Sequence, residues 1–427
     1  MFNMFTSLFS QYKGLSRSVY VFFFARLVTT MGAFIWPLLT LILSRKMGYS
    51  ASTIALVSIG VGVLFLPAQI LGGKLADKFD KKKIIIIFDL ISVTFFMTCA
   101  FIEPGNLMVI LFILAGLFAN MEGPAFEALI AESTKPAERE KVYSLNYLGH
   151  NLGYMFGAAV GGLLFENFLN LAFIFDGLTT ITSTLMIIML VKVIDVQALE
   201  EHEKNEYEDS EEHDVKPWAI LKERKSIMVM LSIFFFSAFV YNQWGFALPL
   251  YLSSLFDTEG ASLFGFISSF NGFLVVLLTP ILTRVLDKYT EIPKIVLGIG
   301  LYSLSFLILI NSNAVFIFYV MITLFTIGEI VTTLGGSPFI SRRIPASHRG
   351  RVSSIIGICY MLGATLGQLV TAYLIDNVSF NAAFALLTLV GLTATVIAGI
   401  NYRIDKKQFP KLYMKDKKTE LQMEASS

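Results

Sequence analysis

Charged side chains are scarce in this sequence of 427 residues, of which 15% are charged and 55% are hydrophobic. A soluble globular protein carries about 25% charged residues, so this chain lacks the polar surface that a soluble fold needs. We therefore expect the bilayer to be its solvent. A helix satisfies its own backbone hydrogen bonds inside lipid, and the long apolar runs described below predict an all-α fold.

Cysteine and cofactor motifs are also nearly missing. The two cysteines, Cys99 and Cys359, lie inside apolar runs, which argues against a disulfide framework. The sequence has no phosphate-binding loop of the G-x-x-x-x-G-K-[ST] type, which argues against ATP-driven transport. It also has no metal-ligand cluster, no nucleophile elbow and no feature of nucleic-acid recognition. We expect a protein that is not an enzyme and that needs no cofactor or metal.

Long apolar runs are abundant instead. A helix that spans the bilayer needs about 20 predominantly apolar residues, and twelve stretches of the chain meet this requirement. They predict twelve transmembrane helices in two six-helix bundles. The predicted spans are residues 18–43, 52–72, 84–102, 107–131, 142–165, 170–193, 227–252, 262–286, 293–311, 314–338, 351–375 and 379–402.

Lysine and arginine lie almost entirely on one side of these spans. Of the 33 basic residues, Arg45 and Lys46 fall on one side, Arg26 lies within a span, and the other thirty share the opposite side with both termini. Because short cytoplasmic loops carry the excess of positive charge, both termini are predicted to be cytoplasmic. We expect a multi-pass monomer in the cell membrane.

An acidic stretch divides the chain. Residues 195–214 contain ten acidic residues and one lysine, so this segment cannot bury a core and is predicted to be a solvated linker. It is either a spacer or a regulatory segment that binds a partner. The basic C-terminal tail is expected to lie against anionic lipid. The predicted organisation is a cytoplasmic segment 1–17, a bundle 18–193, a linker 194–225, a bundle 226–402 and a tail 403–427.

The two halves of the chain repeat each other at an offset of 210 residues. The tripeptide Asp77-Lys78-Phe79 recurs as Asp287-Lys288-Tyr289. A second segment recurs at the same offset, which indicates an internal duplication with parallel repeats. Its matching residues are Arg139, Val142, Gly153 and Gly157 in the first half and Arg349, Val352, Gly363 and Gly367 in the second.

The basic loop GGKLADKFDKKK at residues 72–83 separates the second and third spans. It resembles the loop between helices 2 and 3 of major facilitator superfamily transporters, G-x-L-A-D-R-x-G-R-K, with Asp80 where the family has glycine. The resemblance covers about residues 18–402 and implies secondary transport by alternating access. It also implies conformational gating by this loop and its repeat, through Gly73, Asp77, Lys78, Lys82, Asp287 and Arg349.

Glu329 stands in the tenth predicted helix, within TIGEIVTTLGGSPFI. This context resembles helix 10 of multidrug/proton antiporters, where a Gly-Glu pair carries a functional acid. A carboxylate in a low-dielectric cavity favours its protonated form, so a cationic substrate would compete with the proton. The alternative is an acid whose partner is a neighbouring helix.

Three further ionisable residues fall at a similar depth, at about 1.5 Å per residue from the inner ends of their helices. Arg26 needs a carboxylate, and either Glu122 or a substrate could supply it. His150 is suited to proton relay or to hydrogen-bonded packing. Asp89, Glu127 and Glu132 are expected to reach water near the inner surface, and Asp176 to be structural.

The fifth span contains the run GYMFGAAVGG, with glycines at close-packing intervals. It resembles the antiporter signature G-x-x-x-G-P-x-x-G-G, with Ala158 in place of the proline, and that change weakens the indication of export. The glycines predicted to pack against another helix are Gly153, Gly157, Gly161 and Gly162.

The seventh span carries Tyr241, Gln243 and Trp244. Aromatic and amide groups in a cavity suit amphiphilic cations, although such residues also form interfacial belts. The predicted function is proton-coupled export of amphiphilic or cationic small molecules. Two alternatives remain: a proton-coupled importer of a polar nutrient or peptide, with Arg26 on a substrate carboxylate, and a lipid flippase or receptor without ion coupling.

Overall fold

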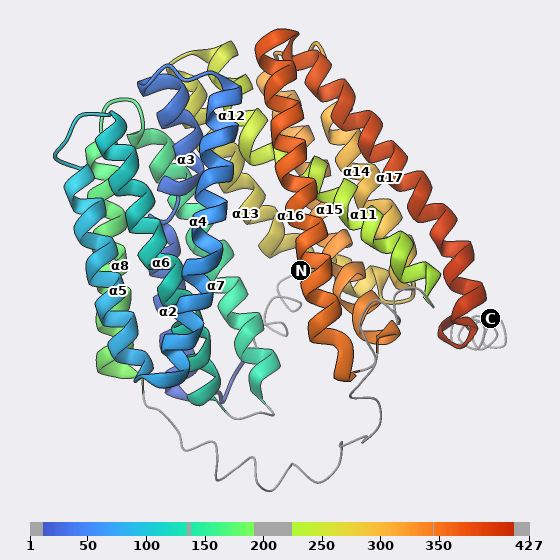
Figure 1. Ribbon diagram of the computed structural model, residues 1–427, viewed down its shortest axis with the longest axis horizontal. Coiled ribbons are helices and arrows are strands. Elements are labelled where there is room, and N and C mark those ends of the chain that lie inside the picture. The colour runs from blue at the N-terminus through green and yellow to red at the C-terminus, as the bar shows by residue number, and fades with distance from the viewer. Residues whose placement is uncertain (1–11, 135–137, 192–223, 345, 414–427) are drawn as a thin grey trace, which may run out of the picture. The chain divides into compact units, whose positions relative to one another are not determined.

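The computed structural model describes residues 12–134, 138–191, 224–344 and 346–413 (Figure 1). Within these residues the regular elements are all helical, which confirms the all-α prediction. The predicted acidic stretch 195–214, the start of the chain and the tail from residue 414 lie outside the described residues. The side chain of Arg349 is also outside them, although its backbone belongs to a helix.

The chain forms two compact units, residues 1–209 with 252–276 and residues 210–251 with 277–427, called unit 1 and unit 2 below. The boundary passes through α12 and α13, so each of these helices contributes to both units. The first eight elements belong to unit 1: α2 (Arg17–Gly32), α3 (Ile35–Leu41), η1 (Ile42–Lys46), α4 (Ala51–Lys78), α5 (Lys81–Cys99), α6 (Asn106–Glu132), α7 (Arg139–Leu164) and α8 (Leu169–Leu190).

The second half of the chain repeats this order. Its helices are α11 (Lys225–Tyr241), α12 (Gln243–Phe256), α13 (Glu259–Leu286), α14 (Glu291–Leu307), α15 (Val315–Arg343), α16 (Ala346–Asn377) and α17 (Phe380–Gln408). Each of the twelve predicted spans therefore corresponds to a helical segment. Among the described residues, nine segments are long and apolar enough to cross a membrane.

Two predicted spans are broken near their middle. The first is interrupted between α2 and α3, four residues before Pro37, whose ring clashes with the carbonyl of residue 33 in a continuous helix. The seventh is interrupted at Asn242, a residue type that favours turns. The two breaks lie at equivalent places in the repeat.

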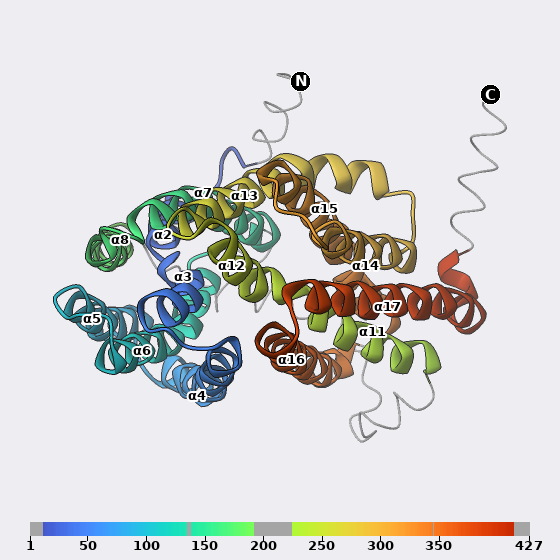
Figure 2. The same cartoon turned by 90° about the horizontal axis from the view of Figure 1, so that it is seen from above.

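Helix pairing repeats between the units, as the internal duplication predicts. In unit 1, α2 packs on α7 and α8, while α5 packs on α6 and α8. In unit 2, α11 packs on α16 and α17, while α14 packs on α15 and α17. Figure 2 shows α5 beside α6 and α14 beside α15.

Glycines allow the closest of these pairings. A Cβ on Gly153 or Gly157 would collide with backbone carbonyls of α2. The repeat partners Gly363 and Gly367 meet backbone carbonyls of α11 in the same way. Because a glycine lets two helix backbones approach closely, the same device fixes α7 on α2 and α16 on α11.

An ion pair also repeats, with its charges exchanged. Lys81 Nζ at the start of α5 lies 2.7 Å from Glu132 Oε1 at the end of α6. At the same offset of 210 residues, Glu291 Oε1 at the start of α14 lies 2.7 Å from Arg342 Nη1 at the end of α15. Each pair joins the same two ends of equivalent helices.

Beside that second pair, unit 2 contains a buried ionic cluster. The Arg343 side chain is 0% exposed and donates to both oxygens of Asp405, at 2.8 and 2.6 Å, and to Glu291 Oε2 at 3.0 Å. Tyr413 donates to Asp405 Oδ2 at 2.6 Å, and Ser226 donates to its other oxygen. The cluster ties α11, α14, α15 and α17 together with the segment after α17.

Candidate functional site

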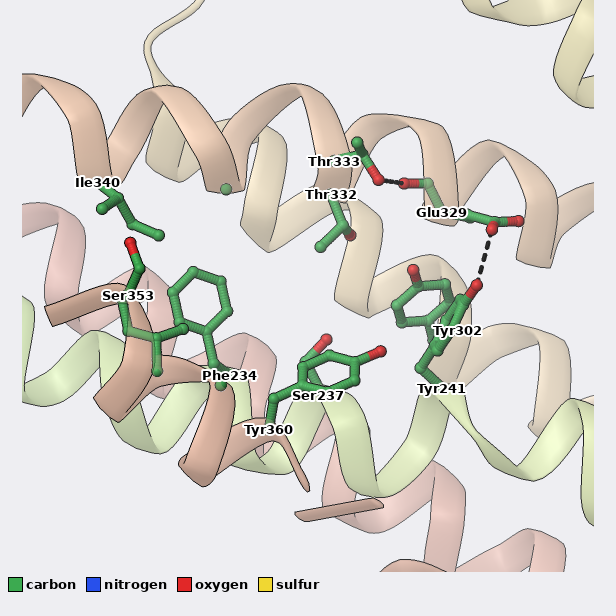
Figure 3. A pocket seen from close by; sticks show the side chains of 13 residues that line it. Phe234, Ser237, Tyr241, Tyr302, Glu329, Thr332, Thr333, Ile340, Ser353 and Tyr360 are labelled. Carbon is green, nitrogen blue, oxygen red and sulfur yellow. Dashed lines mark hydrogen bonds between the residues drawn. The ribbon is translucent and has the colours of Figure 1, made fainter. Parts of the chain in front are cut away.

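Unit 2 contains a cavity of about 480 Å³ between α11, α14, α15 and α16 (Figure 3). Its volume lies within the range of sites that bind small molecules. Apolar and hydroxyl-bearing side chains line it around a single carboxylate. The lining residues are Phe234, Ser237, Tyr241, Tyr302, Glu329, Thr332, Thr333, Gly336, Ile340, Ser353, Ile356, Gly357 and Tyr360.

Glu329 is that carboxylate, and it is held by a hydrogen bond. Tyr241 on α11 donates its hydroxyl to Glu329 Oε1 at 2.7 Å (Figure 3). Thr333 donates to the backbone carbonyl of Glu329, one turn away in α15. The donor on α11 fixes the direction of an acid that projects from α15.

Aromatic rings pack beside the carboxylate. The Tyr241 ring stacks on Phe325 with centroids 5.4 Å apart, and Tyr302 lies 5.6 Å from Tyr241. Tyr302 and Phe325 are 4.9 Å apart. Ring faces attract cations. The carboxylate could bind a proton or an organic cation, and the tyrosine rings beside it would favour the organic cation.

Two predicted substrate contacts do not line this cavity. Gln243 is 0% exposed and donates to the backbone carbonyl of Phe239, within the contact between α11 and α16. Trp244 lies against Phe325, with centroids 5.9 Å apart. Of the three residues predicted on the seventh span, Tyr241 lines the cavity together with Glu329.

Arg26, the arginine within the first span, belongs to unit 1 and has a different partner from the one expected. Its Nη2 lies 2.9 Å from Glu127 Oε1, and its Nε donates to Asn146 at 3.3 Å. The guanidinium also lies 4.3 Å from the ring centroid of Phe126. Since Glu127 takes the ion pair, the alternative in which Glu122 supplies the carboxylate is wrong, and contact with a substrate stays a prediction.

The other two predicted proton-coupling residues are also in unit 1. Glu122 on α6 is within electrostatic range of Asp89, Arg26 and Glu127. His150 is exposed, and its Nδ1 lies 3.5 Å from the hydroxyl of Thr30.

The basic loop of unit 1 has a defined geometry. Asp80, which replaces the family's glycine, caps α5 by accepting from the backbone of Lys83 at 2.9 Å. Lys82 donates to the carbonyl of Val191 at 2.7 Å, where a cation complements the end of α8. Of the two glycines at the start of the loop, Gly72 packs closely on α6, because a Cβ there would collide with the backbone of Met121.

The predicted gating residues are mostly exposed. A Cβ on Gly73 would meet nothing within 4 Å. Asp77, Lys78 and Asp287 are exposed at the ends of α4 and α13. Their gating role stays a prediction.

The sequence reasoning missed Ser237, Tyr302 and Tyr360 as lining residues. A signal was present, because small or polar residues recur at helical spacing on the lining helices. Ser237 and Tyr241 are four residues apart on α11, and Ser353 and Tyr360 are seven apart on α16. In the part of the chain that the structure describes, no group of three or more metal-ligating side chains is present.

Sequence comparison identifies relatives along most of the chain. The Na(+), Li(+), K(+)/H(+) antiporter of Planococcus maritimus is 22% identical over 363 residues, which cover 78% of this chain and 84% of that protein. Multidrug resistance protein MdtH of Yersinia pestis (strain Pestoides F) is 28% identical over 164 residues, 38% of this chain and 40% of that protein.

Structural comparison finds the same fold. A crystal structure of a POT family transporter in complex with 5-aminolevulinic acid has a TM-score of 0.73 at 12% identity and covers 91% of this chain and 96% of that one. The model of the Major Facilitator Superfamily matches residues 21–332 and, in a second match, residues 261–419. The chain therefore belongs to the Major Facilitator Superfamily and is a multi-pass membrane transporter of small molecules.

Proposed function

We propose that this transporter exports cationic or amphiphilic small molecules in exchange for protons, with Glu329 as the residue that binds each in turn. The observation that carries this proposal is the position of Glu329, a carboxylate directed into a cavity with tyrosine walls and held by Tyr241. A carboxylate in such surroundings attracts both a proton and an organic cation. It carries one negative charge, so it cannot neutralise both at the same time. The likeness to a multidrug resistance protein supports the substrate class.

The coupling follows from this competition. A proton on Glu329 removes the negative charge and weakens the hold on a cationic substrate. Loss of the proton restores the charge. If the two six-helix halves open the site to one side of the membrane and then to the other, protons that move down their gradient drive the substrate in the opposite direction. We propose that the gradient is the energy source and that no resident cofactor is needed.

The location belongs to the same proposal. Thirty of the 33 basic residues would face the cytoplasm with both termini inside the cell. We propose the cell membrane as the site of action, a monomer as the working form, residues 18–193 and 226–402 as the two bundles and the basic loop as part of the gate. Glu122 and His150 are proposed as further groups on the proton path.

The test uses proteoliposomes with an imposed pH gradient, in which a cationic fluorescent dye and internal pH are followed together. We expect gradient-driven dye movement by the wild type and its loss in Glu329→Gln, which keeps the shape of the side chain and removes the charge. Glu103→Gln, in an exposed position between α5 and α6, is the matched control and should transport normally. Gradient-driven transport by Glu329→Gln would refute the role of Glu329.

A second candidate is exchange of alkali cations for protons. The likeness to the Na(+), Li(+), K(+)/H(+) antiporter over 78% of this chain favours it. Adding Na⁺, Li⁺ or K⁺ to the same vesicles would move protons in this case, without any dye. Uptake of a polar nutrient or peptide that Arg26→Ala abolishes would instead favour an importer. Headgroup scrambling, or binding without flux, would favour the flippase or receptor.

A further inference from the structure

A carboxylate in unit 1 has an unusual hydrogen-bond environment. Asp89 lies within α5, and its Oδ2 is 2.5 Å from the hydroxyl oxygen of Thr184 on α8. The same hydroxyl oxygen is 2.8 Å from the backbone carbonyl of Thr180, one turn earlier in α8. One hydroxyl therefore makes two short contacts with oxygen atoms.

The number of hydrogens decides how these contacts are made. A threonine hydroxyl has one hydrogen, a backbone carbonyl accepts only, and an ionised carboxylate accepts only. With Asp89 ionised, the single hydrogen of Thr184 must be shared between two acceptors, or one contact is left without a hydrogen. With Asp89 protonated, the acid donates to Thr184 and Thr184 donates to Thr180. Each contact has a hydrogen of its own only when Asp89 carries a proton.

The charges around Asp89 favour the same state. Asp176 on α8 is 3% exposed, its Oδ2 has no hydrogen-bond partner, and it is within electrostatic range of Asp89. Glu122, from α6, is also within that range. These helices are the two that pack most extensively on α5.

Three of the cations around this cluster, Arg26, Lys81 and Lys82, already have partners. Arg26 acts on Glu122, yet its ion pair is with Glu127. On α5 itself, Lys81 pairs with Glu132 and Lys82 binds the end of α8, while Lys83 is exposed near the start of the helix. Three ionised carboxylates beside engaged cations inside the membrane would repel one another at a high energetic cost. A bound proton removes that repulsion.

We propose that Asp89 is a second proton-binding site, in unit 1, which holds its proton through Thr184 and exchanges it during transport. The ligand is a proton, which Asp89 takes from water and returns to water. The role in transport rests on the proposed proton coupling. The presence of the proton on Asp89 does not, because it follows from the contacts with Thr184 and from the neighbouring carboxylates.

Infrared spectroscopy of the purified protein in detergent tests the protonation directly. A protonated carboxylic acid has a C=O stretching band that an ionised one lacks. We expect the wild type at neutral pH to show a band that Asp89→Asn lacks. The side-chain amide of this variant would still donate to Thr184, so the variant keeps the hydrogen bond of the acid. Thr184→Val should shift the frequency of the band, and Asp77→Asn at the exposed end of α4 should leave it unchanged.

The role in transport is measured in the proteoliposomes as the number of protons moved per substrate. We expect Asp89→Asn to lower this number. Absence of a band difference between wild type and Asp89→Asn would overturn the proposal, and so would an unchanged proton number in Asp89→Asn. Glu329→Gln should keep the Asp89 band. The band therefore tests protonation of Asp89 even if the proposed role of Glu329 is refuted.

Discussion

Replacing Asp405 with alanine should strongly destabilise unit 2, because Arg343 depends on it. The Arg343 side chain is fully buried and makes two of its three carboxylate hydrogen bonds to Asp405. Removing one partner of a buried ion pair costs about 3–5 kcal/mol. Glu291 remains as a partner but is shared with the exposed Arg342. We therefore expect a loss of about 3 kcal/mol, at the lower end of that range.

The assay is equilibrium unfolding in mixed micelles with increasing SDS, followed by circular dichroism. Lys406→Ala, exposed on the same helix, is the matched control and should stay within about 0.5 kcal/mol of wild type. The double variant Arg343→Met with Asp405→Leu should recover part of the loss, because it removes the unpaired charge. A cost below about 1 kcal/mol for Asp405→Ala, or no recovery in the double variant, would refute the reasoning.

Three further predictions concern packing and charge. Gly157→Ala should lower the free energy of unfolding by about 1–3 kcal/mol, because the new Cβ collides with the backbone of α2. Gly73→Ala is the control in the same unfolding assay, and it should not destabilise because a Cβ there meets open space. Lys81→Glu or Glu132→Lys alone should lower the stability by about 0.2–1 kcal/mol, and the double variant, which exchanges the two charges, should restore most of this loss. Burial and the hydrogen bond to a carboxylate raise the pKa of Tyr413. The stability that the protonated Tyr413 hydroxyl contributes is therefore present below about pH 10 and lost as the pH rises further. Tyr413→Phe should lose less stability than the wild type between neutral and alkaline pH, and an equal loss would contradict this.

The fold was predictable from the sequence because its main determinants are local. Apolar length defines each span, and the 210-residue offset relates the halves before any contact is known. The breaks before Pro37 and at Asn242 show the limit of this reasoning. Hydropathy continues across both positions, whereas the helix does not.

The candidate site was predictable only in part. Glu329 was identifiable because a carboxylate in an apolar helix is costly wherever it points. Tyr241 was predicted, but Tyr302 and Tyr360 were not, because a tyrosine in an apolar helix is a weaker signal than a carboxylate. The choice between Glu122 and Glu127 as partner of Arg26 required the structure. Depth along a helix does not say which face a residue occupies.

The exchanged charges of the repeated ion pair bear on how the membrane-inserted chain assembles. Two halves with similar helices present a risk that α5 packs on α15, or α14 on α6. In such a mispaired bundle Lys81 would face Arg342, and Glu291 would face Glu132, so both contacts would be repulsive. Only pairing within the same half brings opposite charges together. The inversion thus adds an electrostatic penalty to pairing between the two halves.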